Sequence, residues 1–378
     1  MDKMDTAVLQ GSLSQTVGLF RQDTIQALYL DRVPTGFPRL DALLGGGLPT
    51  GLTVLGAISS LGKSTLALQI AQHISAGGRD VLYFSLEMSE TSIAAKAITR
   101  QMFLNSGMDV GGSLTASQLM SRDYMGREPD RWPAVDAARA VVEEQTRHLH
   151  IRGLDGDGTS AHEIVYQAVA FANETEGPLP VVMVDYLQIL RASDVKLSGT
   201  SRLTVDDSIR HLVHLSKETP VVLISSVNRQ SYGEALELSS FKESGAIEFS
   251  ADVLLGLQYS GVRGASKGDF DMDAAREAVP RKVEVVILKQ RYGPCGPNTC
   301  SRFDYYAAYD LFSEQETGPR PEETEEPTEP KTPGTRIAPE PPAGKLSGKD
   351  SPAAGPAAEP ADSIRAEDLF AGMPEVHI

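Results

Sequence analysis

Apolar residues along the chain fall into two alternating patterns. Short continuous apolar runs, the pattern typical of buried strands, occupy residues 52–57, 80–87, 149–154, 179–190 and 220–228. Longer stretches in which apolar residues recur every three or four positions, the pattern typical of amphipathic helices, occupy residues 63–78, 89–103, 160–177 and 206–219. Buried strands that alternate with helices predict an α/β fold, in which helices cover both faces of a mostly parallel sheet.

Two further regions flank this alternation. Residues 35–51 predict loop and a short helix, and strands, or a strand with a hairpin, are predicted at 246–259 and 281–293. Residues 1–32 predict an N-terminal helix that is too short for a domain of its own. The predicted folded domain therefore covers residues 33–312.

The composition changes sharply at Ser313. Residues 313–378 are dominated by Pro, Glu, Ala and Gly, and their 14 acidic and 6 basic residues account for half of the chain's net charge of −16. Such a segment buries too little apolar surface to offset its chain entropy, so we predict a disordered acidic tail. Apolar residues return at 362–373, where two interpretations remain open: a frayed end, or a short helical peptide that docks on a partner.

The composition also excludes several classes of protein. Of the 378 residues 41% are hydrophobic, which suffices for one large domain or two small ones. Two cysteines, Cys295 and Cys300, are too few for a disulfide scaffold or a zinc site of the usual four-ligand kind. We find no signal peptide and no apolar run long enough to span a bilayer, so we expect a cytoplasmic protein without a membrane partner. Because the folded part is also acidic, nucleic-acid binding requires a local basic patch.

A phosphate-binding loop is the strongest chemical motif. The sequence AISSLGKST at 57–65 fits the pattern G-x-x-x-x-G-K-[ST], with alanine in place of the first glycine. Gly62 allows a tight turn whose amide groups face a phosphate, Lys63 neutralises the β and γ phosphates of ATP, and Ser64 can bind Mg²⁺. The alternative is a Gly-Lys-Ser turn that occurs by chance. The predicted strand before the motif and helix after it favour a phosphate loop instead. The candidate ATP-binding residues are Ala57, Ser59, Ser60, Leu61, Gly62, Lys63, Ser64 and Thr65.

Two carboxylates follow other predicted strands. Glu87 could orient and deprotonate the attacking water, or it is a surface residue ahead of a helix-capping Ser89. Asp185 follows the run VVMV and fits an acid linked to Mg²⁺, although a strand-end aspartate that caps a turn would look the same. Because ligands of parallel sheets bind beyond the carboxyl ends of the strands, we expect Lys63, Glu87 and Asp185 to converge.

Charged residues stand at unusual positions in the last third of the folded part. Lys289 and Arg291 lie two apart in a predicted strand, so both should point to one face. Two cations on one face are costly without an anion, and we interpret them as fingers that reach a γ-phosphate held by an adjacent subunit. A charged edge strand is the alternative. Lys242 and Glu243 form a polar loop ahead of Gly245.

Taken in order, seven segments resemble the C-terminal motor domain of DnaB-type replicative helicases, a hexameric, RecA-like group. The segments are TGFPRLDALLGGGLPTG, GAISSLGKST, FSLEMSE, VVMVDYLQIL, VVLISSVNR, KESGAIEFSADV and LKQRYGP. FSLEM, DYLQ and ESGAIE followed by AD are more specific than a phosphate loop alone. The resemblance implies a RecA-like fold, a ring of six subunits with ATP between neighbours, and DNA unwinding by translocation on single-stranded DNA.

The resemblance also implies roles for single residues. The positions that match the family's catalytic and Mg²⁺-binding residues are Lys63, Ser64, Glu87, Asp185, Lys289 and Arg291, the last two acting in trans. The positions that match the loop contacting the single-strand backbone in the central channel are Lys242, Glu243 and Gly245. Residues 6–27 resemble the linker helix that packs on the next subunit.

Three departures from the family pattern matter. Ser226 in SSVNR replaces the usual Gln of the family's SQLNR motif. The resemblance implies that this motif, here Ser226, Asn228 and Arg229, couples phosphate sensing to the DNA loop. Lys242 replaces an arginine and lacks its planar fork. Residues 1–32 leave no room for the family's N-terminal collar, so we expect a loader, primase or collar protein as partner. By analogy alone, such a trimmed motor suits a plasmid, phage or integrative element.

Two other functions remain open. A RecA- or KaiC-like ATPase would bind DNA without unwinding it; Ser226 favours this function, whereas FSLEM and the pair of cations oppose it. A binding module could instead use ATP only to gate ring assembly and recruit a partner through its acidic tail, but the intact catalytic residues oppose this.

Overall fold

The computed structural model describes residues 32–153, 158–193, 201–228, 231–241, 244–264 and 270–316. Within these residues nine strands form one sheet, in the order β3-β2-β4-β5-β1-β6-β7-β8-β9. In chain order the strands are β1 (Gly51–Ala57), β2 (Val81–Ser85), β3 (Leu149–Arg152), β4 (Val181–Asp185), β5 (Pro220–Ser226), β6 (Val253–Tyr259), β7 (Arg281–Gln290), β8 (Cys300–Tyr306) and β9 (Leu311–Glu314).

The sheet is parallel from β3 to β6 and antiparallel from β6 to β9. Strand β1 lies in the middle, where Ala57 is in register with Ser226 of β5 and Leu257 of β6. Every residue of β1, β2, β4 and β6 is buried, which is why these strands appear in the sequence as continuous apolar runs. The predicted α/β class with a mostly parallel sheet is confirmed.

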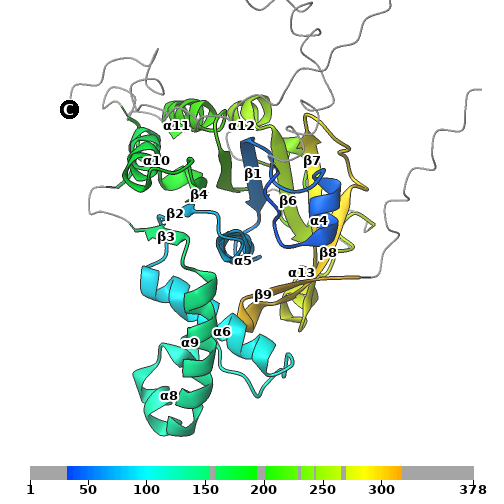
Figure 1. Cartoon of the computed structure of the whole chain (residues 1–378). Helices are drawn as coiled ribbons and strands as arrows, with labels where there is room; N and C mark the ends of the chain where they lie inside the picture. Colours follow the sequence, from blue (N-terminus) through cyan, green and yellow to red (C-terminus); the bar gives the residue numbers. More distant parts are fainter. Residues whose placement is uncertain are drawn as a thin grey trace, which may run out of the picture. The chain divides into compact units, whose positions relative to one another are not determined.

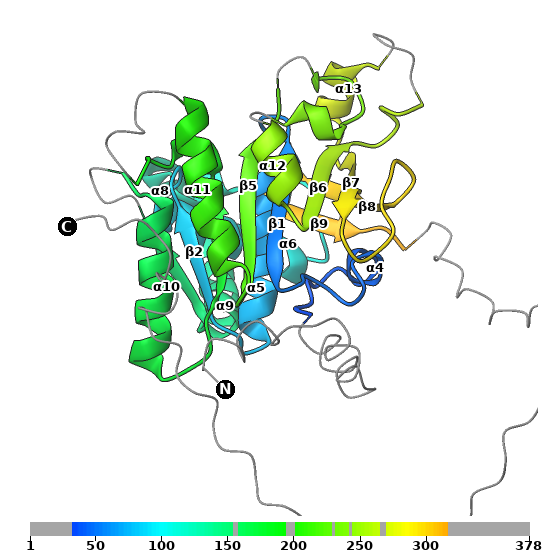
Figure 2. The same ribbon diagram turned by 90° about the horizontal axis from the view of Figure 1, so that it is seen from above.

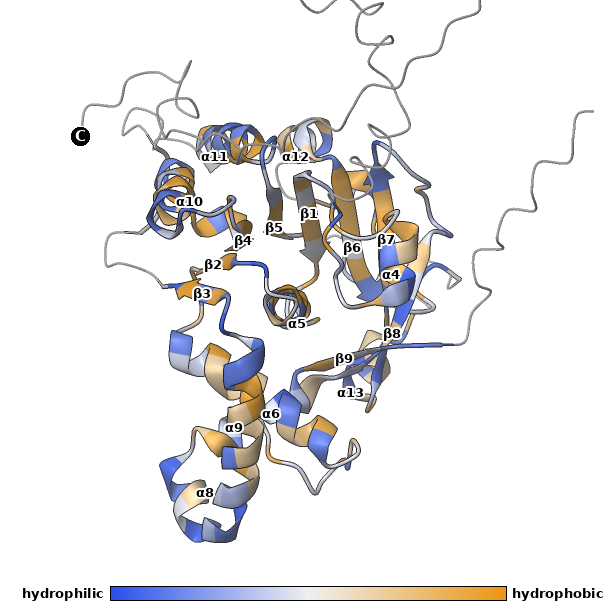
Figure 3. Ribbon diagram, in the orientation of Figure 1, coloured by the Kyte–Doolittle hydropathy of each residue, from blue (hydrophilic) through white to orange (hydrophobic). Residues whose placement is uncertain are grey.

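Helices cover both faces of the sheet (Figures 1 and 2). On one face α5 (Lys63–Ala76) buries an apolar stripe against the strands, and α4 (Pro38–Leu43) packs near β8. On the other face α10 (Ala161–Thr175), α11 (Ser201–Leu215) and α12 (Ser244–Ser250) enclose a second core. The central strands between these helices are largely apolar (Figure 3).

A lobe of helices extends from the sheet on the side of α5 (Figure 1). It consists of α6 (Glu90–Asn105), α7 (Ala116–Leu119), α8 (Arg122–Arg127) and α9 (Trp132–Gln145). The lobe has a small core of its own, formed by Met102, Leu114, Met125, Val135 and Ala138. Only α6 was predicted from the sequence: α7 and α8 are short, and α9 buries only Val135, Ala138 and Val142.

The strand predicted over 246–259 is wrong in its first half. Residues Ser244–Ser250 form α12, and β6 begins only at Val253. Ile247 of α12 is fully buried and Phe249 is 80% exposed. A helix of seven residues makes two turns at most, too few for its apolar spacing to be distinguished from that of a strand.

Two predicted boundaries also change. The strand predicted over 179–190 ends at Asp185 and is followed by a short 3₁₀ turn, Leu187–Ile189. The folded part continues past residue 312, because Glu314 is the last residue of β9. Its carboxylate accepts hydrogen bonds from the backbone N–H groups of Arg39 (2.9 Å) and Leu40 (3.0 Å) and so caps the start of α4.

Several predictions fall on residues that the structure does not describe. The N-terminal helix lies outside the described residues apart from Arg32, and so does the acidic tail from residue 317 onward. Among the described helices, none is both long enough and apolar enough to cross a membrane.

Candidate functional site

The phosphate loop connects β1 to α5 as predicted. Gly62 caps α5 in the left-handed region, at a φ of 93°. A Cβ atom on Gly62 would also lie 2.7 Å from the ring of Tyr305, so both the backbone and the packing require glycine. Lys63 is then the first residue of α5, where the free N–H groups of a helix start attract an anion.

A cavity of 360 Å³ opens over this turn. Its lining residues are Ser59, Ser60, Gly62, Lys63, Ser64, Thr65, Glu87, Met88, Lys96, Tyr186, Ser226 and Tyr305. The structure thus brings together most of the predicted ATP-binding residues with Glu87 and Ser226. Ala57 and Leu61 are fully buried and support the loop from beneath instead of lining the cavity.

Glu87 follows β2 by two residues and lies at the cavity wall. The hydroxyl of Ser89 accepts the N–H of Ser92 (3.2 Å) and so caps α6, as the alternative interpretation of this segment expected. Glu87 thus lies at the cavity wall and also precedes a helix cap, because the capped start of α6 turns the chain away directly after Glu87. The Leu86 N–H donates to the Asp185 carbonyl (2.7 Å) and ties the ends of β2 and β4 together.

Asp185 lies at the end of β4, 1% exposed, behind the cavity. Its Oδ2 atom accepts a hydrogen bond from the Tyr83 hydroxyl (3.0 Å), whereas its Oδ1 atom is buried without a hydrogen-bond partner among the described residues. Burial raises the pKa of Asp185 and the charge of Glu87 adds to this, while the Ser64 and Tyr83 hydroxyls and the charge of Lys63 oppose it. A buried carboxylate oxygen without a partner, beside a serine hydroxyl, is a donor set that fits Mg²⁺.

Three contacts to the loop were not predicted from the sequence. The Tyr232 hydroxyl accepts the N–H of Ser59 (3.2 Å) and donates to its Oγ atom (3.0 Å). The guanidinium of Arg281 donates to the carbonyl of Ser60 (3.2 Å) and lies 5.9 Å above the ring of Tyr305. Neither residue stands in a recognisable motif, so no local signal marked them.

A third unpredicted contact joins the loop helix to the lobe. Asp310 is almost completely buried and accepts hydrogen bonds from Thr65 (3.0 Å) and from Lys96 of α6. Arg100 of α6 donates to the carbonyl of Asp310 (3.3 Å), and burial lowers the pKa of Arg100 to about 10. Thr65 is therefore held by a protein carboxylate at one edge of the cavity.

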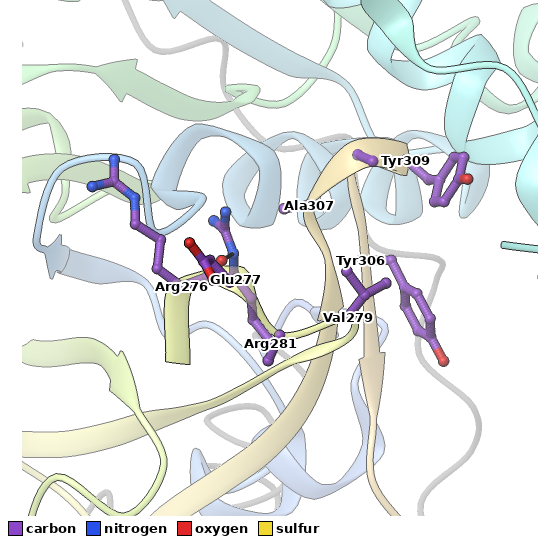
Figure 4. A pocket seen from close by; sticks show the side chains of 9 residues that line it. Arg276, Glu277, Val279, Arg281, Tyr306, Ala307 and Tyr309 are labelled. Carbon is purple, nitrogen blue, oxygen red and sulfur yellow. Dashed lines mark hydrogen bonds between the residues drawn. The ribbon is translucent and has the colours of Figure 1, made fainter. Parts of the chain in front are cut away.

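A second cavity of 420 Å³ lies beside Arg281. Figure 4 shows Arg276 and Glu277 of α13 (Met272–Glu277) and Arg281 of β7 on one side, and Tyr306 and Tyr309 on the other. Arg281 also donates to the Arg276 carbonyl (2.7 Å). Because Arg281 contacts both this cavity and Ser60, the two cavities adjoin.

Lys289 and Arg291 lie at the opposite end of the sheet from the phosphate loop. Arg291 Nε forms an ion pair with Asp252 Oδ1 (3.0 Å), and Asp252 Oδ2 accepts the N–H of Leu52, near the beginning of β1 (2.8 Å). The phosphate loop follows the other end of β1, and a seven-residue strand spans about 20 Å. The pair therefore cannot reach the cavity of its own subunit.

The expectation that the pair shares one strand face needs a correction. Strand β7 ends at Gln290, and its pairing with β6 shifts register at Leu254 and Leu255. Arg291 thus lies beyond the strand. Burial lowers the pKa of Lys289, and the positive charge of Arg291 lowers it further. Both cations are held by residues of the same chain: Arg291 by Asp252, and Lys289 through a hydrogen bond from its Nζ atom to the Glu248 carbonyl (2.5 Å).

A family model described as the DnaB-like helicase C terminal domain matches residues 32–312. The chain belongs to this family. It is 28% identical over 290 residues to Replicative DNA helicase DnaB of Pasteurella multocida (strain Pm70), covering 75% of this chain and 56% of the relative. The protein of the same name from Geobacillus stearothermophilus is 24% identical over 316 residues, covering 78% and 63%. The chain thus spans little more than half the length of these relatives.

Two solved structures share the fold. One, an ATPase domain, aligns with a TM-score of 0.62 at 22% identity, over 81% of this chain and all of that chain. A DnaB-like replicative helicase, whose structure was described together with its interactions with primase, aligns with a TM-score of 0.59 at 22% identity, over 78% of this chain and 66% of that one. The RecA-like fold class is confirmed.

The segment SSVNR at the end of β5 departs from the family's SQLNR pattern at Ser226. Ser226 ends β5 and lines the cavity, and its N–H donates to the side-chain oxygen of Gln188 (3.2 Å). The Gln188 amide in turn donates to Ser225 (3.0 Å), so an amide lies beside the position where the family's Gln is missing. The Asn228 side chain donates to the carbonyl of Phe241 (3.4 Å).

The remaining predicted residues belong to the DNA loop. Gly245 lies in the first turn of α12, with open space around its Cα. Lys242, Glu243 and Arg229 lie outside the described residues, so their assignment stays a prediction.

Proposed function

We propose that this chain is an ATP-driven DNA motor, which hydrolyses ATP at the phosphate loop and translocates on single-stranded DNA to unwind duplex DNA during replication. One observation carries this proposal: Lys63, Ser64 and Glu87 meet in one cavity, with Asp185 directly behind it. A nucleotide-binding module without hydrolysis would not need the water-activating Glu87 or the buried Asp185.

Each residue at this cavity has a role in the proposed reaction. The amide groups of the loop and Lys63 bind the phosphates, and Glu87 orients and deprotonates the attacking water. Ser64 and Asp185 would hold Mg²⁺, which neutralises charge on the phosphates. The adjoining cavity with Arg281 and Tyr306 is the proposed site for the base and sugar, because cationic and aromatic side chains can stack on a nucleobase.

The position of Lys289 and Arg291 supports assembly from several subunits. A catalytic face at one end of the sheet and a cationic face at the other end are not self-complementary. Such surfaces make head-to-tail contacts, which close into a ring or continue as a helical filament. We propose a ring of six subunits from the family resemblance, in which this pair completes the neighbour's ATP site.

The proposed partners rest on similarity. Lys242, Glu243 and Gly245 would contact the DNA backbone, which gives affinity without sequence preference. A primase partner is proposed because one DnaB-like relative was described together with primase. A loader or collar protein, an origin in a plasmid, phage or integrative element, and a cytoplasmic location remain proposals on the same ground.

A second candidate function is a RecA- or KaiC-like ATPase that binds DNA without unwinding it. Ser226 favours this function, because it lacks the side-chain amide that would report the state of the phosphate to the DNA loop. The amide of Gln188 beside Ser226 weakens this argument.

An unwinding assay separates the two functions. With ATP, the chain is expected to separate a forked duplex that carries single-stranded arms, and a fully paired duplex should remain intact. The Lys63→Ala variant is the control, because it loses the phosphate-binding cation. DNA-stimulated hydrolysis without strand separation would support the RecA-like function and contradict unwinding.

A further inference from the structure

The cationic pair Lys289 and Arg291 is anchored by one short segment of the chain. Helix α12 supplies the Glu248 carbonyl that accepts a hydrogen bond from Lys289. Asp252, two residues after α12 ends, supplies the carboxylate that pairs with Arg291 Nε, and its backbone carbonyl accepts the Arg291 N–H (3.0 Å). Both cations are therefore held from residues 248–252.

Asp252 is itself fixed in place. Its second carboxylate oxygen accepts the N–H of Leu52 (2.8 Å), at the start of β1. Gly51 leaves room for this contact, because a Cβ atom there would lie 2.7 Å from the same oxygen. A carboxylate that is bound on both oxygens has little freedom to rotate, so it presents a constant orientation to Arg291.

The anchor leaves the reactive part of Arg291 available. The ion pair with Asp252 is at the Nε atom, and no hydrogen bond from Nη1 or Nη2 is found within the described part of the chain. These two nitrogens form the fork that matches two oxygens of a phosphate. The side chain remains about half exposed.

An unanchored pair would be poorly placed for catalysis. Two neighbouring cations repel each other, and a long arginine side chain loses rotamer freedom when it is held in one geometry. A fixed anion offsets the repulsion and orders the guanidinium before the neighbouring subunit arrives. A displacement of about 1 Å at a catalytic group can cost about 10²-fold in rate, so such ordering matters.

The geometry points to Asp252 as the positioning residue of the trans-acting arginine: it aims Arg291 at the phosphates of the nucleotide bound by the next subunit. This inference rests on the proposed function. It also places the anchors of both cations on the segment that follows Gly245, so α12 joins the predicted DNA loop to the residues that complete the neighbour's ATP site.

The test uses the full chain and the variant Asp252→Asn, which keeps an acceptor for Leu52 and removes the charge. We expect kcat for ATP hydrolysis to fall about 10²-fold, with a KM for ATP within about twofold of the original. Asp252→Glu should retain more activity because the charge remains. The matched control is Asp304→Asn, which removes a carboxylate paired with Lys282 (2.7 Å) on the same antiparallel ribbon and should leave kcat unchanged.

Mixing distinguishes positioning from damage to the fold. Asp252→Asn subunits have an intact phosphate loop, and Glu87→Ala subunits have an intact Arg291 with its anchor. Mixtures of the two should regain activity, which a defect within the Asp252→Asn subunit's own cavity would prevent. Wild-type kcat in Asp252→Asn, alongside an inactive Arg291→Ala variant, would overturn this inference alone. Absence of hydrolysis by the wild-type chain would overturn the proposed function as well.

Discussion

Replacing Arg291 by alanine is expected to lower ATP hydrolysis by about 10³-fold or more while nucleotide binding is retained. The reason is the separation of about 20 Å between Arg291 and the phosphate loop along β1, which leaves the subunit's own binding residues untouched. Hydrolysis by a phosphate-release assay and binding of a fluorescent ATP analogue measure the two effects. Arg139→Ala, which removes an exposed arginine of α9, is the control and should behave like wild type.

Mixed assemblies give this prediction its sharpest form. Arg291→Ala and Glu87→Ala subunits are each expected to be inactive alone. When they assemble together, some interfaces combine an intact Glu87 with an intact Arg291, and hydrolysis should return in proportion to those interfaces. Full loss at every mixing ratio would contradict the trans role of Arg291.

Replacing Asp185 by asparagine is expected to have two opposite effects. Hydrolysis should fall about 10²-fold or more, because the Mg²⁺ site loses its only charged ligand among the proposed ones. The free energy of unfolding without nucleotide or metal should rise at neutral pH, because burial raises the pKa of Asp185 and the ionised carboxylate opposes folding. Thermal denaturation at pH 7, without Mg²⁺, measures the second effect.

The sign of the pH dependence follows from the raised pKa. Asp185 contributes stability that is fully present below its unfolded pKa and is lost as pH rises through its folded pKa. The advantage of Asp185→Asn over wild type should therefore shrink on acidification toward pH 4. A lower melting temperature of Asp185→Asn at pH 7 would contradict this account.

Asp207 offers a matched control of opposite sign. Burial alone would raise its pKa, but hydrogen bonds from Ser193 and the nearby His211 and Arg210 outweigh burial and lower it. Its stabilising contribution is present above the unfolded pKa and is lost as pH falls through the folded pKa. Asp207→Asn should thus destabilise the protein at pH 7.

The central fold could be predicted from the sequence because its physical causes are local. Strands β1, β2, β4 and β5 are buried on both faces, so each one is a short apolar run, and α5 and α10 carry apolar residues at helical spacing. The phosphate loop could be predicted for the same reason. Gly62, Lys63 and Ser64 are adjacent in sequence, and the turn needs them in that order.

Other elements carry no such local signal. Helix α12 is too short for its period to be recognised, and α7 and α8 bury few residues. Strands β8 and β9 belong to an antiparallel edge: buried residues alternate with less buried ones along β8, which breaks the apolar run, and β9 has only four residues. Glu314 belongs to the fold only because it caps a helix more than 270 residues earlier in the chain.

The candidate site divides in the same way. Lys63, Glu87 and Asp185 each follow a predicted strand. Their convergence could be predicted because ligands of parallel sheets bind beyond the carboxyl ends of the strands. The contacts of Tyr232 and Arg281 with the loop join residues separated by 173 and 221 positions, and only the folded chain brings them into contact. Asp252 was visible as part of a motif, yet its bonds to Leu52 and Arg291 follow from strand pairing, which the sequence does not specify.

The most direct test of the central claim is the rate of ATP hydrolysis by the full chain with and without a long single-stranded oligonucleotide, at one fixed salt concentration. A motor that uses ATP to move on single strands is expected to hydrolyse ATP several-fold faster with the oligonucleotide, and the stimulation should weaken as salt rises because phosphate contacts weaken. Equal rates with and without the oligonucleotide at low salt would contradict it.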